Sequence, residues 1–573
     1  MSDHGMGWPG GWSDPSHAAR SQDTTPLAAA LGNQLFTNEL DAALATIRQQ
    51  TGLAKLELVG LDACLMGQLE VYSMLAKHAN YAVASEETEP GLGWAYSGFL
   101  SELAAKPTMD GAALGKLIVD SYIVEDQRIV DDVARAEMLR QGSPMGGGLF
   151  SYAAPTSAEV ANQMGRAATL SAVDLAMVPS VVEQLNGLCA TLQGQNQRPM
   201  AQARNYAQSF TSIFGEQVPA SYVDLGNWLH LLKQAGASAS VNQAADQVWS
   251  AMQTAIIAEK HGAGKAGATG MAIYFPNSQL YRAPVAGPAS YTAIAESFAR
   301  DSLWDDYLTH HYTGRAFDAS AREPAVPESG ANVTAPGGGE IALTQVQVSN
   351  PVAAPGAPVV LSTDISGGNL GYMLLVAGYY DSAANSVLMY DMDYLQSEDT
   401  REVDGVYYPV WPEGAFTLEF EWEPLVYYIS NGSDQALALL TPATYGATAE
   451  DAVYTTDGIY SFASGEQLQA RLYFRDGVLR QVFGFTGGTS AAAPREIYPQ
   501  TGDSFTVAEQ WLDLDAQGRV VKRSYQKGGT LTFSDSMFTW EEMDAAAGDY
   551  MVGFIATDLD GNQQQAYAQV RVQ

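Results

Sequence analysis

Apolar residues recur at helical spacing in several stretches of the first 315 residues. Between residues 38 and 50, Leu40, Ala43, Leu44 and Ile47 fall on one face of a helix. Further helices are expected at residues 65–77, 179–192 and 239–259. Short apolar runs predict strands at residues 56–61, 81–85, 169–175 and 270–275. Strands that alternate with helices favour a parallel sheet that is covered by helices on both faces.

The pattern changes beyond residue 315. Pro, Ala, Gly and Glu accumulate in residues 316–340 and the periodicity fades, which predicts a linker. After the linker, apolar and polar residues alternate in short runs between turns, as is typical of antiparallel β-sandwiches. The clearest of these runs are residues 341–348, 359–365, 372–380, 416–422, 468–474 and 550–556. The sequence therefore predicts an α/β domain at residues 1–315, followed by all-β sandwich domains at 341–455 and 456–573.

The charge of the chain narrows the range of partners. Its 573 residues include 64 acidic and 29 basic side chains, for a net charge of −35. Such a surface repels phosphates, so no nucleic acid partner is expected, and it attracts cationic substrates. No apolar run approaches the roughly 20 residues that a bilayer requires, so no transmembrane segment is expected.

Two cysteines, Cys64 and Cys189, exclude a disulfide framework and allow at most one bridge. Cys189 lies on a helical apolar pattern and is expected to pack in the core. Cys64 follows the run at residues 56–61, where the end of a strand places reactive groups. The helix expected at residues 65–77 would favour a thiolate there. Taken alone, without the sequence around it, Cys64 is better explained as an inert buried thiol.

A thiolate nucleophile needs a base and backbone N–H groups for the oxyanion. The expected base is His4, whose neighbour Gly5 lets the main chain approach a substrate carbonyl. A histidine that precedes the cysteine is the caspase order. His261 also precedes a glycine but follows the cysteine, which makes it the weaker candidate. The remaining histidines show no metal-ligand spacing: His17, His78, His230, His310 and His311.

The segments around Cys64 resemble a known family. Asp62-Ala63-Cys64-Leu65-Met66-Gly67, Glu70-Val71 and the run from Ala84 to Trp94 closely resemble the clostripain family of cysteine peptidases. Shorter family-like pieces follow in order at residues 171–175, 222–225, 270–276 and 304–308. The resemblance therefore covers roughly residues 1–315 and implies a caspase-like αβα sandwich.

The resemblance also implies an activity, namely endopeptidase cleavage after Arg or Lys through a thioester acyl-enzyme. His4 and Cys64 correspond to the catalytic dyad, and the N–H groups of Gly5 and Cys64 to the oxyanion hole. Asp62 corresponds to the residue that binds the basic side chain before the scissile bond, where a carboxylate partner is needed. A helix cap is the alternative use of Asp62.

Ser85 and Glu87 are expected to help line the same pocket, with a solvated acidic loop as the alternative. Arg20, in the polar stretch between Trp12 and Thr25, is the expected point of self-cleavage, because relatives mature by cleavage between the histidine and the cysteine. The chemistry requires no cofactor. Some relatives need calcium, and this acidic chain is compatible with that need.

The amino terminus departs from the family pattern. Relatives carry a first strand and helix and a second strand before the histidine, whereas His4 stands almost at the start here. We therefore expect the chain to lack these elements together with any signal peptide of an extracellular enzyme.

The departure keeps two alternatives open: an inactive peptidase-like protein for extracellular binding or adhesion, and a glycan-binding protein built on the β domains. In an active enzyme the β domains would position substrate or attach it to a surface. Aspartate-rich turns at residues 513–515 and 558–562 are expected to be hairpins rather than calcium loops.

Overall fold

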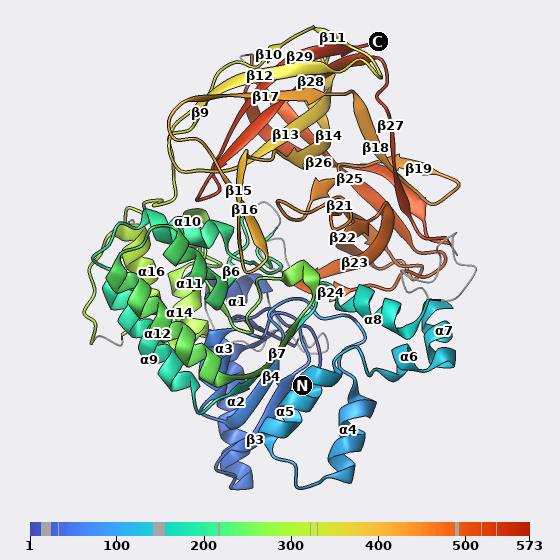
Figure 1. Cartoon of the computed structure of the whole chain (residues 1–573). Helices are drawn as coiled ribbons and strands as arrows, with labels where there is room; N and C mark the ends of the chain where they lie inside the picture. The colour runs from blue at the N-terminus through green and yellow to red at the C-terminus, as the bar shows by residue number, and fades with distance from the viewer. Residues whose placement is uncertain are drawn as a thin grey trace.

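The structure is a computed structural model with an α/β region followed by a large β region (Figure 1). It describes residues 1–12, 25–31, 34–140, 155–215, 218–320, 323–328, 331–487, 492–516, 518–534 and 536–573. In Figure 1 the α/β region, coloured blue to green, lies below the β region, coloured yellow to red. This order of regions confirms the predicted fold class. No helix within the described ranges has the length and apolar character needed to cross a membrane.

The α/β region is built on a mixed sheet with strand order β3-β4-β5-β7. Its strands are β3 (Leu56–Leu61), β4 (Ala79–Ala84), β5 (Thr169–Asp174) and β7 (Ile256–His261). The β3–β4 pair is parallel, but β5 runs antiparallel to β4 and β7 antiparallel to β5. The expectation of a parallel sheet therefore holds for β3 and β4 alone, because hydrophobic runs do not reveal strand direction.

Helices cover both faces of this sheet. On one face, α5 (Gly111–Ser121) packs on β4, β5 and β7, and joins α4 (Tyr96–Ala105) and α8 (Ser157–Gly165) in one apolar cluster with Val83 and Leu170. On the other face, Ala82 and Val173 pack in a second core. The helices of that core include α2 (Thr37–Thr51), α3 (Leu69–Leu75), α9 (Val178–Leu192) and α12 (Ala239–Ala255). The arrangement is an αβα sandwich, as predicted.

Two predicted helices have different bounds in the structure. The helix expected at residues 65–77 begins only at Leu69, because residues 62–68 form the loop that carries Cys64. The helix expected at residues 239–259 ends at Ala255, and the chain continues directly into β7. The strand expected at residues 270–275 is β8 (Ala272–Tyr274), which pairs with β6 (Tyr222–Asp224) outside the main sheet.

The remaining elements of the α/β region are short. They are β1 (Gly10–Gly11), α1 (Pro26–Leu31), β2 (Leu35–Phe36), α6 (Gln127–Val130), α7 (Asp132–Arg140), α10 (Arg198–Tyr206), α11 (Leu225–Gln234), a 3₁₀ turn (Ala263–Lys265), α13 (Ser278–Arg282), α14 (Pro288–Ile294), α15 (Glu296–Asp301) and α16 (Trp304–Thr313). Between α16 and β9 (Ala342–Leu343), the described residues contain no helix or strand.

Among the described residues, the β region has three apolar cores, the smallest of which lies between β13, β14, β25 and β28, and the strands of these cores interleave along the chain. The first core joins strands between residues 341 and 426 with the terminal hairpin of β28 (Gly548–Asp558) and β29 (Gln563–Val572). The second core consists of buried side chains that lie between residues 429 and 538 of the sequence. The expected division at residue 455 falls within β21 (Val453–Ser461), so the boundary lies elsewhere. The sequence does not reveal this because β28 and β29 return to pair with an early strand, β13 (Leu370–Asp381).

The other strands of the β region are β10 (Gln347–Val348), β11 (Val352–Ala353), β12 (Val359–Ser366), β14 (Ser386–Tyr394), β15 (Asp399–Val403), β16 (Val406–Val410), β17 (Phe416–Trp422), β18 (Leu425–Ser430), β19 (Gln435–Leu437), β20 (Thr441–Pro442), β22 (Gln467–Arg475), β23 (Val478–Gly487), β24 (Ala492–Glu496), β25 (Ser504–Leu514), β26 (Val520–Thr532) and β27 (Thr539–Asp544).

The two regions are packed against each other through side chains. Tyr206 of α10 stacks on Tyr408 with ring centroids 4.9 Å apart. Asp404, in the β15–β16 turn, accepts a hydrogen bond from Asn227 at 3.0 Å. Asp560 accepts from the Ser278 N–H at 3.0 Å at the start of α13. A backbone N–H of the protein thus binds Asp560 in the turn at residues 558–562. This turn joins the antiparallel strands β28 and β29, so it is the expected hairpin.

Candidate active site

Cys64 lies in the loop that follows β3, at the carboxyl end of the parallel pair. Only 6% of its surface is exposed, and the next residue, Leu65, adopts a left-handed conformation with φ 65°. Because α3 begins at Leu69, the thiol does not sit at a helix amino terminus. The expectation that a helix favours the thiolate is therefore wrong. Cys64 and Cys189 are both free, and Cys189 is buried in the core as predicted.

The first residues of the chain extend the sheet beside β3. Ser2 forms a parallel bridge with Asp62, in which the Asp3 N–H donates to the Asp62 carbonyl at 3.2 Å. His4 and Cys64 each stand two residues beyond this bridge, and neighbouring strands lie about 5 Å apart. The two side chains therefore start from the same end of adjacent strands. Within the described ranges no hydrogen bond joins the imidazole of His4 to the thiol.

Gly5 brings the histidine segment into direct contact with the cysteine loop. A Cβ atom at residue 5 would lie 2.2 Å from the carbonyl oxygen of Cys64 and 3.1 Å from the Cβ of Ala63. Any side chain at residue 5 would therefore displace the main chain of the cysteine loop. A glycine is required here for close approach of two backbones rather than for a turn.

Among the described residues, the N–H groups of Gly5 and Cys64 donate to no backbone carbonyl. Their neighbours are engaged, since the Met6 N–H donates to the Gly10 carbonyl at 2.8 Å and the Leu65 N–H to the Glu87 carbonyl at 3.1 Å. Among the described residues, no acceptor is bound by the N–H of Gly5 or of Cys64. Two unengaged donors beside a thiol are the groups that an oxyanion requires.

The segment after His4 is anchored in the core by Trp8. Its indole is fully buried and packs on Tyr274 and Tyr291, with ring centroids 5.4 and 5.1 Å away. The backbone N–H of Trp8 donates to Oε1 of Gln68 at 2.9 Å. The bond joins the histidine segment to the cysteine loop, because Gln68 is the residue directly before α3.

Glu89 contacts the thiol directly. Its backbone N–H donates to Sγ of Cys64 at 3.3 Å. Burial raises the pKa of the Cys64 thiol, an effect that this hydrogen bond opposes only in part. Burial also lowers the pKa of His4, while the charge of Asp3 raises it and that of Arg495 lowers it. In this arrangement the thiol and the imidazole are both neutral at neutral pH.

Asp62 forms an acidic pair with Glu89 beside the thiol. One oxygen of Asp62 accepts from the Tyr96 hydroxyl at 2.7 Å, and Glu89 accepts from the indole N–H of Trp94 at 3.2 Å. Burial and the neighbouring Asp62 hold the pKa of Glu89 well above its usual range. Among the described residues, Oε2 of Glu89 and the Tyr122 hydroxyl have no hydrogen-bond partner. The cluster is a buried group of acidic and aromatic side chains that contains two polar atoms without a hydrogen-bond partner among the described residues.

Ser85 and Glu87 have internal partners in the structure. The Ser85 hydroxyl, fully buried, donates to the Glu87 carbonyl and contacts the Thr169 hydroxyl, each at 2.9 Å. The Glu87 carboxylate forms a buried ion pair with Lys265 at 2.6 Å and accepts from the Thr211 N–H at 3.2 Å. Both residues therefore shape the loop that carries Glu89.

Sequence reasoning missed Glu89 and Lys265. Glu89 lies within the quoted run from Ala84 to Trp94, so its spacing from Cys64 was visible, but its contact with the thiol was not. Nothing in the sequence links Lys265 to Glu87.

The other candidate residues lie elsewhere. Arg20 falls in residues 13–24, outside the described residues, as does His17. His261 contacts Glu259 at 2.8 Å at the end of β7. His78 pairs with Asp41 at 2.5 Å, and His230 with Asp404 at 2.7 Å. In the described part of the chain, no group of three or more His, Cys, Asp or Glu residues is placed to hold a metal ion.

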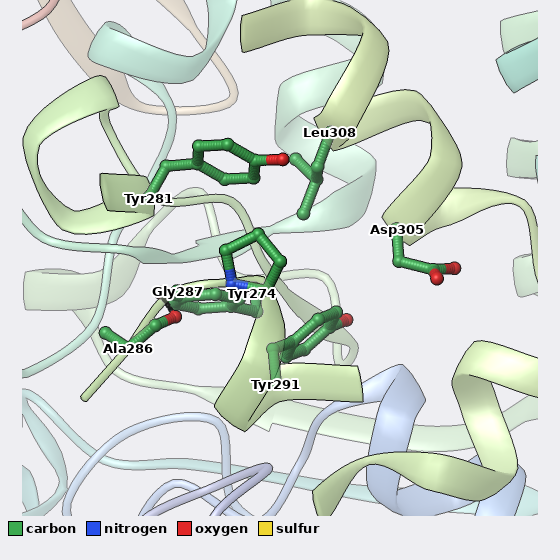
Figure 2. Close-up of a pocket in the computed structure, with 8 residues that line it drawn as sticks. Tyr274, Tyr281, Ala286, Gly287, Tyr291, Asp305 and Leu308 are labelled. Carbon is green, nitrogen blue, oxygen red and sulfur yellow. Dashed lines mark hydrogen bonds between the residues drawn. The ribbon is translucent and has the colours of Figure 1, made fainter. Parts of the chain in front are cut away.

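A small cavity of about 10 Å³ lies in the α/β region, and neither Cys64 nor His4 lines it. Tyr274, Tyr281 and Tyr291 line it together with Leu308 and Asp305, and Figure 2 shows the rings gathered on one side of Asp305. The volume corresponds to about one water molecule. The cavity is too small to hold a substrate side chain.

The fold and the site define an α/β protein with a thiol and a histidine at neighbouring strand ends. Residues 1–139 match the model of the Clostripain family. This match confirms the resemblance to the clostripain family of cysteine peptidases over residues 1–139. Residues 140–573 lie outside that match. No curated protein sequence is matched by the chain.

Several solved structures show limited similarity. A secreted C11 cysteine protease from Bacteroides thetaiotaomicron, in complex with an irreversible peptide inhibitor, is 15% identical with a TM-score of 0.31, over 51% of this chain and 70% of its own. An inactive zymogen of a C11 protease from Parabacteroides distasonis is 14% identical with a TM-score of 0.31, over 54% of this chain and 68% of its own. At such scores the similarity supports no conclusion about function.

Proposed function

We propose that the chain is a secreted cysteine endopeptidase that cleaves after Arg or Lys, with Cys64 as nucleophile and His4 as base. The observation that carries the proposal is the contact between Gly5 and Cys64, with both N–H groups unengaged. A purely structural loop would be expected to satisfy such donors. The match of residues 1–139 to the clostripain family supports the same reaction.

In the proposed reaction, Sγ of Cys64 attacks the carbonyl carbon of the scissile peptide while its proton passes to His4. The tetrahedral oxyanion accepts hydrogen bonds from the N–H groups of Gly5 and Cys64. The carbon–nitrogen bond then breaks, His4 donates the proton to the leaving amine, and a thioester remains. Water hydrolyses the thioester and restores the thiol.

The acidic pair of Asp62 and Glu89 supports the preference for a basic side chain. A guanidinium or ammonium that enters beside Asp62 would replace the proton that burial keeps on Glu89. The exchange offers two carboxylates to one cation and leaves the net charge of the cluster unchanged, because one proton leaves as one positive charge enters. The net charge of −35 favours the approach of such substrates.

The test is hydrolysis of fluorogenic peptides that end in Arg, Lys, Ala or Asp, with and without calcium. The proteins are wild type, Cys64→Ala and, as a matched control, Cys189→Ala. We expect cleavage after Arg or Lys that falls by about 10³-fold or more in Cys64→Ala and persists in Cys189→Ala. Absence of cleavage by the folded protein, or cleavage that survives Cys64→Ala, would refute the proposal.

A second candidate is an extracellular binding protein on an inactive peptidase scaffold. The observation that favours it is the burial of a neutral thiol, with 6% of Cys64 exposed. A thiol-reactive peptide probe with Arg or Lys at its reactive end separates the two candidates, because it labels Cys64 only in a competent enzyme. In the enzyme, the β region would position substrate or attach the protein to a surface.

A further inference from the structure

A strand of the β region lies against the face of the α/β region that carries Cys64. It consists of β24 and the two residues after it, and residues 492–498 are here called the β24 arm. Figure 1 shows β24 at the junction between the two regions. At the start of the arm, the Ala492 N–H donates to the Ile213 carbonyl at 2.8 Å. Ala493 is 2% exposed and belongs to the core of the α/β region.

The other end of the arm is fixed to the loop after β4. Oε2 of Glu496 accepts hydrogen bonds from the Gly91 N–H at 2.7 Å and from the Tyr498 hydroxyl at 3.0 Å. The ring of Tyr498 lies so close to Gly91 that a Cβ atom there would be 2.8 Å from Cε2. The arm is therefore held at two separate points of the α/β region.

Both anchor points lie a few residues from the loop that contacts Cys64. Thr211, two residues from Ile213, donates its N–H to Glu87 at 3.2 Å, and Glu89, two residues from Gly91, donates its N–H to the thiol at 3.3 Å. Residues 492–496 form an extended strand that spans about 13 Å at about 3.3 Å per residue. That length joins the two anchor points, and the thiol is only 6% exposed.

We propose that the β24 arm is an internal cover that closes the Cys64 site and moves aside before a peptide enters. The arm can leave without unfolding its own domain, because its ladder to β23, from Phe483↔Glu496 to Gly487↔Ala492, does not involve the α/β region. The contacts that must break include the hydrogen bonds to Ile213 and Gly91 and the packing of Ala493 in the core of the α/β region. The positive charge of Arg495, in the middle of the arm, also disfavours a protonated His4 while the cover is in place.

The cover is tested by the rate at which iodoacetamide alkylates Cys64, followed by mass spectrometry on the full chain. Glu496→Ala and Tyr498→Ala each remove contacts with Gly91, and Glu421→Ala, an exposed carboxylate on β17, is the matched control. We expect at least tenfold faster alkylation in both arm variants and an unchanged rate in the control. Equal rates in wild type and both arm variants would overturn the proposal.

Cys189 serves as an internal reporter of folding, because it is fully buried in α9. Cys64 labelling that rises while Cys189 stays protected supports local opening, whereas joint labelling indicates an unfolded variant. In that event Glu496→Gln, which keeps the side chain's shape, replaces the alanine variant. It is expected to speed Cys64 alkylation by a smaller factor, and an unchanged rate in this folded variant overturns the cover.

The idea of a substrate behind the cover rests on the proposed function, but the alkylation readout does not. Faster alkylation without peptide hydrolysis would support the cover and refute the peptidase. Equal alkylation rates together with peptide hydrolysis by the wild type would overturn the cover and support the peptidase.

Discussion

The α-carbon of Gly5 lies against the carbonyl oxygen of Cys64, so closely that an added Cβ would approach it to 2.2 Å. The contact joins the expected base segment to the expected nucleophile loop through main-chain atoms alone. It leaves the N–H groups of both residues free of protein acceptors within the described ranges. The relative position of His4 and Cys64 thus depends on the absence of a side chain at residue 5.

Gly5→Ala is therefore expected to displace the cysteine loop. A backbone oxygen cannot yield as a flexible side chain does, so we expect destabilisation of about 1–3 kcal/mol. Peptide hydrolysis should fall by about 10²-fold, since a shift of 1 Å at the reacting groups costs that much. Thermal unfolding and the fluorogenic assay measure the two effects.

Gly187→Ala is the matched control for this substitution. Gly187 lies inside α9 with nothing within 4 Å of an added Cβ. Alanine there should stabilise the helix by about 0.5–1 kcal/mol and leave hydrolysis unchanged. Wild-type activity in Gly5→Ala would contradict a role for the close contact.

Asp62→Asn tests the acidic pair. The amide keeps the size of the side chain and an acceptor for the Tyr96 hydroxyl, but it removes the charge expected to bind a basic side chain. We expect kcat/KM for peptides that end in Arg or Lys to fall by about 30-fold or more, which corresponds to about 2–5 kcal/mol. Peptides that end in Ala provide the control, and an equal loss for both substrates would argue against recognition by Asp62.

Lys265→Met tests the ion pair beneath the loop that contacts the thiol. The substitution leaves Glu87, only 2% exposed, as a buried carboxylate without its cation. Removal of one partner from a buried pair costs about 3–5 kcal/mol. Thermal unfolding should therefore show a large decrease in Tm.

Lys233→Met is the control, because its pair with Asp246 is solvent-exposed on both sides. An exposed pair contributes about 0–1 kcal/mol. Similar changes in Tm for the two variants would show that the Lys265–Glu87 pair has no special weight.

Asp305→Asn tests the pH dependence of stability. Burial raises the pKa of Asp305 to about 7, against about 3.9 in an unfolded chain. Between these values the folded state holds a proton that the unfolded state has lost, so wild-type stability decreases as the pH rises from about 4 to about 7. The variant lacks this titration, and its Tm relative to wild type should increase over that window and then level off.

Asp301→Asn, at an exposed residue that ends α15, should show no such trend. Glu70, whose pKa burial raises to about 7, contributes in the same direction in both proteins and therefore cancels in the difference. A difference in Tm that stays constant from pH 4 to pH 8 would contradict the titration of Asp305.

The sequence predicted the elements around Cys64 well because their signals are local. The apolar run at residues 56–61 is β3 without change, and the pattern at residues 38–50 became α2 with one residue added at each end. The helix expected from residue 65 begins only at Leu69, since residues 65–68 belong to the loop that carries Cys64 and contacts Gly5 and Glu89. Strand direction in β5 and β7 also escaped prediction, because periodicity carries no information about it.

By itself, the sequence determined the family resemblance of the amino-terminal part, the order of an α/β region before a β region, and the residues proposed for the chemistry. These follow from spacing and residue type, which are properties of neighbours along the chain. Only the tertiary structure decided which distant groups meet. It brought Gly5 onto Cys64, paired Glu87 with Lys265, returned β28 and β29 to the first β core, and laid the β24 arm against the thiol face. Such contacts depend on how packed surfaces fit together, and no local pattern encodes them.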